Sequence, residues 1–374
     1  SKSSKIVYYK INNTNDGIIK YGIDYKSSNI IVKAYEDSKD PETGLISSKD
    51  NKFVKLKLIN NSTSNDTVTL NTVFGYENGG NLIVPSGNTL VTQKIKKANI
   101  MKGAESNPST TTKFLNTSIV RNTIESITMT NDNIVPTTAI GSFDISNNND
   151  GSIMMWYTDT NSNDLYEVYI GSESGITTFP DDSKNLFAYL SNVTSIDLKF
   201  TNVTNTSSMI NMFYQDTKLK EIDLSSFKTS SLLYFVNMFE GCSSLVTLDL
   251  SGFDTSRITN FTNLFKNCTN LKEINLPDSI NYIGERAFRS TSLTQVVLPK
   301  NLQNLQYDTF NGCRKLKNVV LNEGLKTTAS YAFGGTAIEK IVLTSTIESI
   351  NGSTFIHCNN LKEIDVSKNN NFIF

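Results

Sequence analysis

Four cysteines and a single histidine are the side chains of this 374-residue chain most suited to nucleophilic or metal chemistry. Cys242, Cys268, Cys313 and Cys358 each follow a phenylalanine by three residues, and His357 stands beside the last cysteine. Zinc sites use short Cys-x-x-Cys or His-x-x-x-His spacings, and the chain has neither. We therefore expect no metal site. Cysteines at one position of a repeat suit small buried packing roles, so we predict four free thiols and a solvated His357.

Disulfides are the alternative for cysteines in an extracellular chain. Cys268 and Cys313 stand two repeats apart, as do Cys313 and Cys358. Strands spaced by about 4.8 Å would separate each pair by about 9 to 10 Å, beyond the roughly 7 Å that a disulfide spans. Cys242 and Cys268 are one repeat apart, but parallel side chains would hold their Cβ atoms about 4.8 Å apart, which is too far.

Catalytic signatures are also missing from the sequence. There is no Gly-x-Ser-x-Gly elbow or Gly-rich phosphate loop, and one histidine supplies no plausible triad. The acidic residues fall on a regular ladder, whereas a glycosidase needs two carboxylates in a cleft. We therefore expect no enzyme, no catalytic residues and no cofactor.

The charge balance and the apolar runs argue against two further classes of protein. The 35 Lys and Arg balance 36 Asp and Glu, which gives no basic field for nucleic acid. No apolar run is long enough to span a membrane.

The elements that position these residues follow from an eightfold repeat in the second half of the chain. Each copy has a phenylalanine, an apolar residue six positions later (five in the fifth and seventh copies), and two more apolar residues three and five positions after that one. The copies are Phe187/Val193/Ile196/Leu198, Phe213/Leu219/Ile222/Leu224, Phe239/Leu245/Leu248/Leu250, Phe265/Leu271/Ile274/Leu276, Phe288/Leu293/Val296/Leu298, Phe310/Leu316/Val319/Leu321, Phe333/Ile338/Ile341/Leu343 and Phe355/Leu361/Ile364/Val366. The last position recurs every 26 residues through the fourth copy and every 22 or 23 residues afterwards. This period predicts a leucine-rich solenoid of eight coils.

Each coil is expected to contribute one strand to a parallel ladder. The last two apolar positions are two residues apart, so they share the inner face of an extended strand. Eight paired strands at about 4.8 Å spacing would make a ladder on the order of 35 Å long. The residue between the two inward positions points outward and forms a column of Asp197, Asp223, Asp249, Asn275, Val297, Val320, Val342 and Asp365.

The outward column supplies the candidate partner-binding residues. Three stacked aspartates repel one another unless solvent, salt or a cation screens them, so the interpretations are a solvated face, a weak calcium site or a basic partner. Three stacked valines reflect either β propensity or a partner-binding strip, because solenoids usually bind across the strand-lined face. The candidates are Asp197, Asp223, Asp249, Asn275, Val297, Val320 and Val342, and we look first between Asn275 and Val342, near the change in repeat length. Carbohydrate binding would need aromatic residues in this column, and it has none.

The first coils are longer than the later ones and are expected to contain short helices. Ile258, Phe261 and Leu264 follow a helical spacing in the third coil, and Ser256 is well placed to cap a helix there.

Residues 1–138 lack the repeat and have a different pattern. Val54 to Leu58 alternates strictly between apolar and polar residues, as in a half-buried strand. Extended runs recur at 5–9, 29–35, 52–59, 67–74, 89–95 and 124–129, with Asn, Ser and Gly clusters between them. The fold prediction is therefore mainly β with short helices: an antiparallel β-sandwich over 1–138, then a leucine-rich-repeat solenoid over 139–374, with a cap at 139–185 and eight coils at 186–374.

Several segments carry a resemblance to known families. Phe253-Asp254-Thr255-Ser256 and Asn263-Leu264-Phe265-Lys266-Asn267-Cys268 resemble the longer repeats of a family of bacterial surface lipoproteins. Leu276-Pro277, Ile283-Gly284, Ala287-Phe288 and Asn311-Gly312-Cys313 resemble the BspA-like leucine-rich repeats of bacterial cell-surface proteins. The stretch from Asp150 to Tyr157 looks like the leader before the longer repeats. The resemblance covers roughly residues 140 to 374 and implies a secreted or surface-attached protein used in adhesion or host contact.

We accordingly expect an adhesion or protein-interaction module, monomeric, that contacts a host or extracellular-matrix glycoprotein through the strand face of the solenoid. The alternative is a structural surface-layer or stalk protein without its own ligand. The resemblance implies an extracellular, cell-surface location, but the chain contains no lipobox or sorting signal, so the mode of anchoring stays open. The start at Ser1 and the end just after a repeat strand suggest a piece of a longer precursor.

Overall fold

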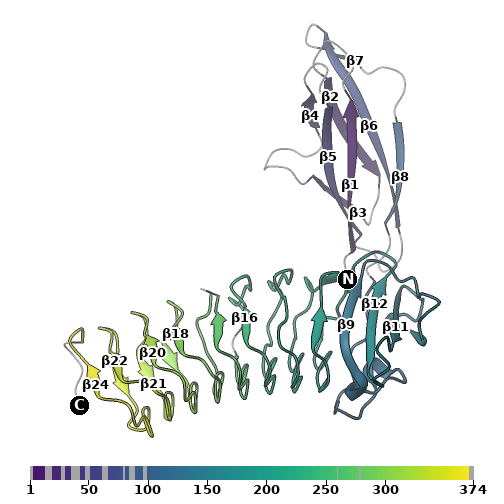
Figure 1. Cartoon of the computed structure of the whole chain (residues 1–374). Helices are drawn as coiled ribbons and strands as arrows, with labels where there is room; N and C mark the ends of the chain where they lie inside the picture. Colours follow the sequence, from purple (N-terminus) through teal and green to yellow (C-terminus); the bar gives the residue numbers. More distant parts are fainter. Residues whose placement is uncertain are drawn as a thin grey trace. The chain divides into compact units, whose positions relative to one another are not determined.

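The computed structural model describes residues 99–369 except Thr259 and Asp278 and, before them, the backbone of strands β1 to β8. The chain divides into two compact units, Ser1–Ala98 and Asn99–Phe374 (Figure 1). The Asn/Ser clusters expected as turns in the first unit, and residues 370–374 after the last repeat strand, lie outside the described residues.

The first unit contains two antiparallel sheets. One has the order β1-β5-β3 and the other the order β4-β2-β6-β7, with β8 also paired to β6. The strands are β1 (Ser3–Asn12), β2 (Ile19–Lys26), β3 (Ile30–Ala34), β4 (Thr43–Ile46), β5 (Asn51–Asn60), β6 (Asp66–Asn78), β7 (Asn81–Ile83) and β8 (Thr89–Ile95). The strictly alternating run from Val54 to Leu58 lies in β5. The packing of the two sheets into a sandwich stays a prediction.

The second unit begins at Asn99, well before the predicted boundary at residue 139. Its first sheet has the order β10-β11-β12-β9-β14. The strands are β9 (Ile124–Thr130), β10 (Gly141–Asp144), β11 (Ile153–Thr158), β12 (Tyr166–Ser172) and β14 (Ser195–Asp197) of the first coil. The run at 124–129, predicted as part of the first domain, is therefore a cap strand. It pairs in parallel with β14, and its buried Ile127 and Met129 continue the core of the first coil.

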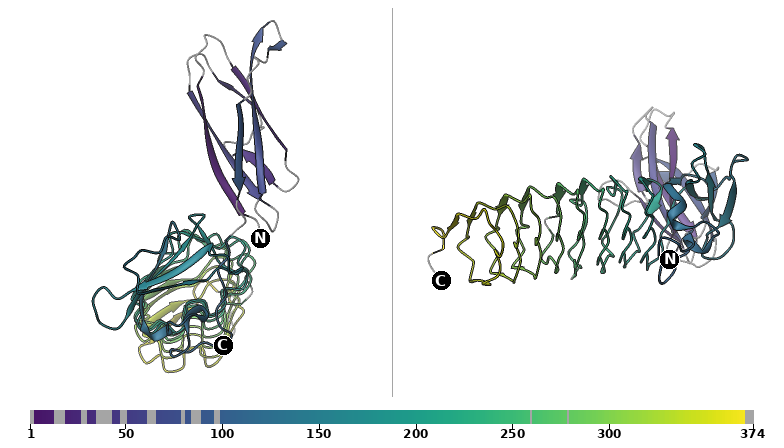
Figure 2. Two further views of the ribbon diagram at one scale, coloured as in Figure 1. Left: turned by 90° about the vertical axis from the view of Figure 1, so that its right-hand side faces the viewer. Right: turned by 60° about the horizontal axis from the view of Figure 1, so that its bottom comes forward.

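The eight coils follow the cap strand β9 and stack in sequence order as far as β24 (Figure 1), and they overlie one another along the stack (Figure 2). Their outward-facing strands are β14, β16 (Thr247–Asp249), β17 (Glu273–Asn275), β18 (Gln295–Val297), β20 (Asn318–Val320), β22 (Lys340–Val342) and β24 (Glu363–Asp365). Short strands on a second side are β13 (Thr177–Thr178), β15 (Thr201–Asn202), β19 (Asn304–Leu305), β21 (Thr327–Thr328) and β23 (Ser349–Ile350).

The predicted continuous ladder is interrupted. Within the described residues, the outward-facing strands pair as β9-β14, β16-β17, β18-β20 and β22-β24, all in parallel. Residues 222–224 of the second coil form no strand, and β17 and β18, on either side of the change in repeat length, do not pair. The repeat phase therefore predicted which residues point outward, but not where the backbone pairing stops.

The core is a stack of equivalent side chains. The repeat phenylalanines form a spine of eight rings, Phe187, Phe213, Phe239, Phe265, Phe288, Phe310, Phe333 and Phe355. Neighbouring ring centroids lie 5.1 to 5.7 Å apart with the planes within 18° of parallel. The predicted inward positions pack beside the spine, with the exception of Ile364 in the last coil, which is 37% exposed. Each ring depends on its neighbours for burial, as expected of a solenoid.

The expected short helix in the third coil is wrong. Each of the first seven coils has a residue with left-handed φ two positions before and two positions after its phenylalanine, for example Asn263 and Asn267 around Phe265, and the eighth coil has one, His357. An α-helix needs a continuous run of right-handed residues, so these segments are turns. The backbone N–H and hydroxyl of Ser256, the expected helix cap, donate to Asp254 Oδ1 in such a turn. The only helical segments described are the 3₁₀ turns η1 (Phe114–Asn116) and η2 (Arg121–Thr123).

The four cysteines are free and buried, which confirms the prediction. Each thiol donates to the carbonyl oxygen of the preceding coil's spine phenylalanine, at 2.9 to 3.0 Å. The pairs are Cys242 with Phe213, Cys268 with Phe239, Cys313 with Phe288 and Cys358 with Phe333. His357 is exposed, as predicted, and occupies the left-handed position that follows each spine phenylalanine by two residues.

An asparagine ladder runs along the first four coils and stops where the repeat shortens. Asn211 Nδ2 donates to Asn185 Oδ1, Asn237 to Asn211 and Asn263 to Asn237, at 2.9 to 3.1 Å. Asn263 Oδ1 is buried and has no hydrogen-bond partner among the described residues. The next coil places Arg286 at this position.

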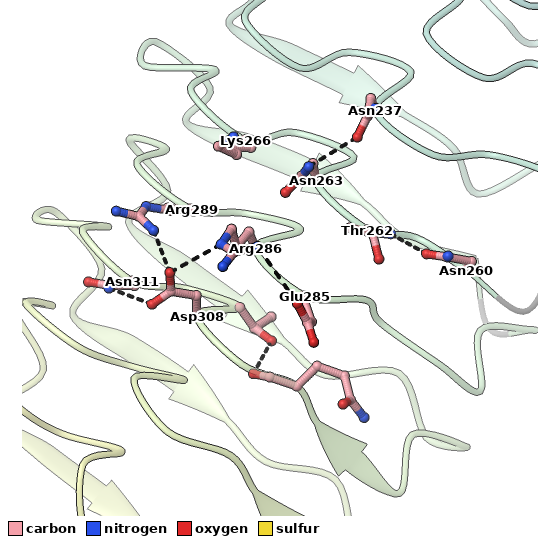
Figure 3. Close-up of polar contacts among 12 residues, drawn as sticks. Asn237, Asn260, Thr262, Asn263, Lys266, Glu285, Arg286, Arg289, Asp308 and Asn311 are labelled. Atoms are coloured by element: carbon pink, nitrogen blue, oxygen red, sulfur yellow. Dashed lines mark hydrogen bonds and ion pairs between the residues drawn. The ribbon is translucent and has the colours of Figure 1, made fainter.

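An ion-pair cluster replaces the ladder in the fifth and sixth coils (Figure 3). Arg286 Nε lies 3.5 Å from Oδ2 of the buried Asp308, and Arg289 pairs with the same oxygen. Asn311 Nδ2 donates to Asp308 Oδ1 at 2.6 Å. The change in repeat length thus coincides with a change in the contacts that join neighbouring coils.

Candidate functional site

The strand face is the surface formed by the outward side chains of the coil strands. Strand register brings four of the candidate residues together in two pairs. Asp249 lies opposite Asn275 in β16 and β17, and Val297 lies opposite Val320 in β18 and β20. All four side chains are exposed. The acidic and apolar parts of the predicted column are therefore each built on a hydrogen-bonded strand pair.

The remaining candidates have other neighbours. Asp197 lies opposite Thr128 of the cap strand β9, and Val342 lies opposite Asp365 in the last coil. Asp223 belongs to the second coil, which contributes no strand. The column is thus divided into blocks where the prediction had one continuous stack.

The aspartates of the column have a shared local role that the repeat phase alone did not indicate. In each, Oδ1 accepts the backbone N–H of the residue two positions later, at 2.8 to 2.9 Å. The pairs are Asp197 with Lys199, Asp223 with Ser225, Asp249 with Ser251 and Asp365 with Ser367. This is the Asx turn that short acidic side chains favour. The recurring Asp-apolar-Ser triplets at 223–225, 249–251 and 365–367 are the sequence signal for it.

The turns also hold the aspartates in their charged form. The backbone N–H of Ser225 lowers the pKa of Asp223, and the hydroxyl and N–H of Ser251 lower the pKa of Asp249. Hydrogen bonds from Ser367 lower the pKa of Asp365 to about 2. Hydrogen bonding to a carboxylate favours ionisation, so these residues carry full negative charge at neutral pH.

The three aspartates of the first coils line one open hollow of about 690 Å³, the acidic hollow. Glu221 and Lys199 also line it. Among the described residues, none of Asp197, Asp223 and Asp249 forms an ion pair. The acidic hollow is therefore lined by four carboxylates and one lysine, which leaves a net negative charge open to solvent.

A second open hollow of about 660 Å³, the junction hollow, lies where β17 and β18 fail to pair. Asn275 lines it on one side and Val297 on the other. Val297 is 69% exposed and its neighbour Val320 is 56% exposed. Two adjacent valines with most of their surface in water form the apolar part of the strand face.

The third valine of the predicted strip differs from the first two. Val342 is half-buried. Beside it, Lys340 Nζ lies 2.7 Å from Glu363 Oε1 and 3.1 Å from Asp365 Oδ2. The last coils of the strand face are therefore covered by paired charges, and the exposed apolar surface is concentrated at Val297 and Val320.

The strand face continues into the cap, which sequence reasoning missed. Strand register aligns Trp156, Tyr169, Thr128 and Asp197 in one row across β11, β12, β9 and β14. The Trp156 and Tyr169 rings stack with centroids 5.8 Å apart. Aromatic residues thus lie beside the acidic column, although Trp156 is only 5% exposed. Pairing between the cap and the first coil creates this row, so no repeat pattern could have predicted it.

Two features are absent from the described part of the chain. There, no group of three or more His, Cys, Asp or Glu side chains is arranged to hold a metal ion. No helix in the same residues has the length and apolar character needed to cross a membrane.

Comparisons with solved structures find leucine-rich-repeat proteins of bacteria. A leucine-rich repeat protein from Bacteroides ovatus is 17% identical, with 56% of this chain and 69% of that chain covered and a TM-score of 0.35. The leucine-rich repeat protein of T. pallidum is 22% identical, covering 48% and 85%, with a TM-score of 0.33. A leucine-rich cell surface protein from Faecalibacterium prausnitzii is 16% identical, covering 78% and 94%, with a TM-score of 0.18. No curated protein sequence matches this chain.

Comparison with family models gives the assignment. The model described as the BspA type leucine-rich repeat region matches residues 182–313 and 283–374 in six copies, which together span more than half of the chain. The matched residues contain the eight coils and the strand face. Repeat families of this type are typically non-enzymatic and suggest a protein-interaction module. The chain therefore belongs to the BspA-type leucine-rich-repeat family.

Proposed function

We propose that this protein is a bacterial cell-surface adhesion module that binds a host or extracellular-matrix glycoprotein through its strand face. One observation carries the proposal. Val297 and Val320 lie side by side in paired strands with 69% and 56% of their surface exposed. Adjacent exposed apolar side chains on an ordered strand face are typical of interaction surfaces, and solenoids commonly bind across that face.

The cell-surface location rests on similarity. The Faecalibacterium prausnitzii neighbour is described as a cell surface protein, and the family match covers the same kind of repeat. For this chain, an extracellular location and a monomeric state belong to the proposal.

Binding of the intact chain to immobilised host-matrix glycoproteins tests the proposal by surface plasmon resonance. The variant Val297→Lys/Val320→Lys/Val342→Lys should lose binding, because three cations would replace the apolar strip. Ile176→Lys is the matched control, since Ile176 is also exposed, by 42%, but lies outside the outward-facing strands. Equal binding by the triple variant and the unmodified chain would remove the strand face from consideration.

A structural stalk is the second candidate, and the phenylalanine spine favours it. Eight parallel rings in contact give a regular core along the whole stack. A stalk without its own ligand predicts no saturable binding to any glycoprotein in the same screen. Saturable binding that depends on Val297 and Val320 would exclude it.

A further inference from the structure

The strand face has two chemically different parts, and together they define a partner. We propose that the partner presents a cationic segment to the acidic hollow and an apolar anchor to Val297 and Val320, within a single stretch of polypeptide. This inference rests on the proposed function only in assuming that the strand face is the binding surface. It adds the chemistry of the partner, whether or not that partner is a matrix glycoprotein.

Charge complementarity supports the cationic segment. Asp197, Asp223 and Asp249 point into one open hollow and form no ion pair among the described residues. The same column contains an internal contrast, because Asp365 in the last coil is already paired with Lys340. Like charges held close together are unfavourable, and Lys or Arg side chains of a partner would relieve that repulsion.

The apolar anchor follows from the junction hollow. Val297 forms part of its lining, and Val320 is the paired neighbour of Val297 on the adjacent strand. An aliphatic or aromatic side chain that covers both valines would remove apolar surface from water, which is the main driving force of association. A purely electrostatic partner would leave this surface exposed.

The spacing of the two parts fits one short peptide segment. Asp249 and Val297 are two coils apart, or about 10 Å at a coil spacing of about 4.8 Å. Asp197 and Val320 are five coils apart, or about 24 Å. An extended chain that rises about 3.3 Å per residue covers that distance in roughly seven or eight residues. A 12-residue peptide is therefore long enough to reach both parts.

Selection from a random 12-residue phage-displayed peptide library on the intact immobilised chain tests the proposal. We expect the enriched peptides to combine Lys or Arg with an aliphatic or aromatic residue in the same peptide. Raising NaCl from about 50 to 500 mM should weaken capture by about tenfold, because salt screens charges on an open surface. Enrichment of acidic peptides, enrichment of peptides with no charge preference, or no enrichment at all would overturn the proposal.

The contribution of the acidic hollow is tested by replacing its aspartates with asparagine, which removes charge and keeps the side-chain shape. In Asp197→Asn/Asp223→Asn/Asp249→Asn, each amide oxygen still accepts the turn N–H, so the fold is retained while three charges are lost. Asp365→Asn is the matched control, because Asp365 has the same turn and column position outside the acidic hollow. The triple variant should capture the enriched peptides at least about tenfold less well and lose the salt dependence, and the control should not. Similar capture by both variants would contradict the cationic segment.

The apolar arm uses Val297→Thr/Val320→Thr, which keeps the side-chain shape and the β propensity. Enriched peptides should dissociate at least about tenfold faster from this variant, because loss of an apolar contact acts mainly on dissociation. Unchanged dissociation would contradict the anchor. Failure of the matrix-glycoprotein screen alongside success of these two arms would reject the proposed glycoprotein partner and leave the partner chemistry standing.

Discussion

The carbonyl oxygen of a spine phenylalanine accepts two kinds of hydrogen bond. The N–H three residues later in the same coil donates to it, as Cys242 N donates to Phe239. The thiol of the next coil donates to it as well, as Cys268 Sγ does to Phe239. The cysteines therefore fasten one coil to the previous one. The position of the cysteines within the repeat predicted that they are buried. It could not predict their hydrogen bonds, because the accepting carbonyl oxygen is placed by the geometry of the turn.

This role predicts that the thiols are unreactive in the folded protein. Burial raises the pKa of Cys242 and Cys268, and raises that of Cys313 to about 11. Since the thiolate is the reactive species, Ellman's reagent should modify none of the four in the native chain and all four in denaturant. Rapid modification of a native thiol, or a total below four, would contradict this arrangement.

Asp216 occupies the cysteine position of the second coil and is fully buried. Its Oδ1 accepts the N–H of Leu190, and its Oδ2 has no hydrogen-bond partner among the described residues. Burial raises its pKa well above the usual value, against the opposing effects of the Leu190 N–H and Arg121. The folded state therefore binds the Asp216 proton more tightly than the unfolded state does. This contribution to the stability of the fold is fully present below the ordinary carboxyl pKa and is lost as pH rises through the raised pKa.

Replacing Asp216 by the cysteine found in other coils should stabilise the protein at neutral and higher pH. Asp216→Cys removes a buried acceptor without a partner, which costs about 1–3 kcal/mol, and supplies a thiol that can donate to Phe187. Thermal unfolding at pH 5 and pH 8 should show a smaller loss of stability between the two pH values for the variant. Asp365→Cys should leave the pH dependence unchanged, because the Asp365 carboxyl has a pKa of about 2 and stays ionised at both pH values. An unaltered pH dependence in Asp216→Cys would assign the effect to another group.

At the scale of the element, the asparagine ladder makes a directional series of contacts. An internal member donates to one neighbour and accepts from the next, whereas Asn263 only donates. Both Asn237 and Asn263 have left-handed φ, so alanine carries the same backbone strain at either position. The difference between the two alanine variants isolates one side-chain hydrogen bond.

Asn237→Ala should accordingly destabilise the chain by about 1 kcal/mol more than Asn263→Ala. Urea unfolding of the two variants measures the difference, with the unmodified chain as reference. Equal loss of stability would show that the ladder contributes through backbone conformation alone.

The sequence predicted the elements unevenly, for physical reasons. Inward and outward positions follow from strand periodicity, so the exposure of Val297 and Asp249 could be predicted. Strand pairing depends on small shifts between neighbouring coils, so the missing pairing between β17 and β18 could not be predicted from the sequence. Helical spacing around Phe261 was misleading, because the segment forms turns that contain left-handed residues such as Asn263. Family resemblance and period together indicated the architecture, and neither indicated the cap strand β9.

At the scale of the whole second unit, stability depends on contacts between nearest neighbours. An internal spine ring such as Phe265 stacks on two rings, Phe239 and Phe288, whereas Phe355 stacks on Phe333 alone among the described residues. The effect of a substitution should therefore depend on the position of the coil in the stack.

Phe265→Leu should lower the unfolding free energy by roughly twice as much as Phe355→Leu, since each aromatic pair is worth about 0.5–1.5 kcal/mol beyond buried area. Calorimetry should also show the transition of Phe265→Leu broadening or dividing, because weakening a central coil uncouples the two sides of the stack. Two variants with the same loss and the same sharp transition would argue for a single cooperative core.

The end of the asparagine ladder at Asn263 bears on how such a chain can grow. A duplicated 26-residue unit placed between Asn185 and Asn263 would add one more rung and meet an asparagine on each side. The same unit inserted after the fifth coil would separate Arg286 from Asp308 and leave the buried carboxylate without its neighbouring cation. Insertion of a whole coil should therefore be tolerated before the fifth coil and should destabilise the chain after it. Family members that differ in the number of repeats should accordingly gain or lose whole coils before the fifth.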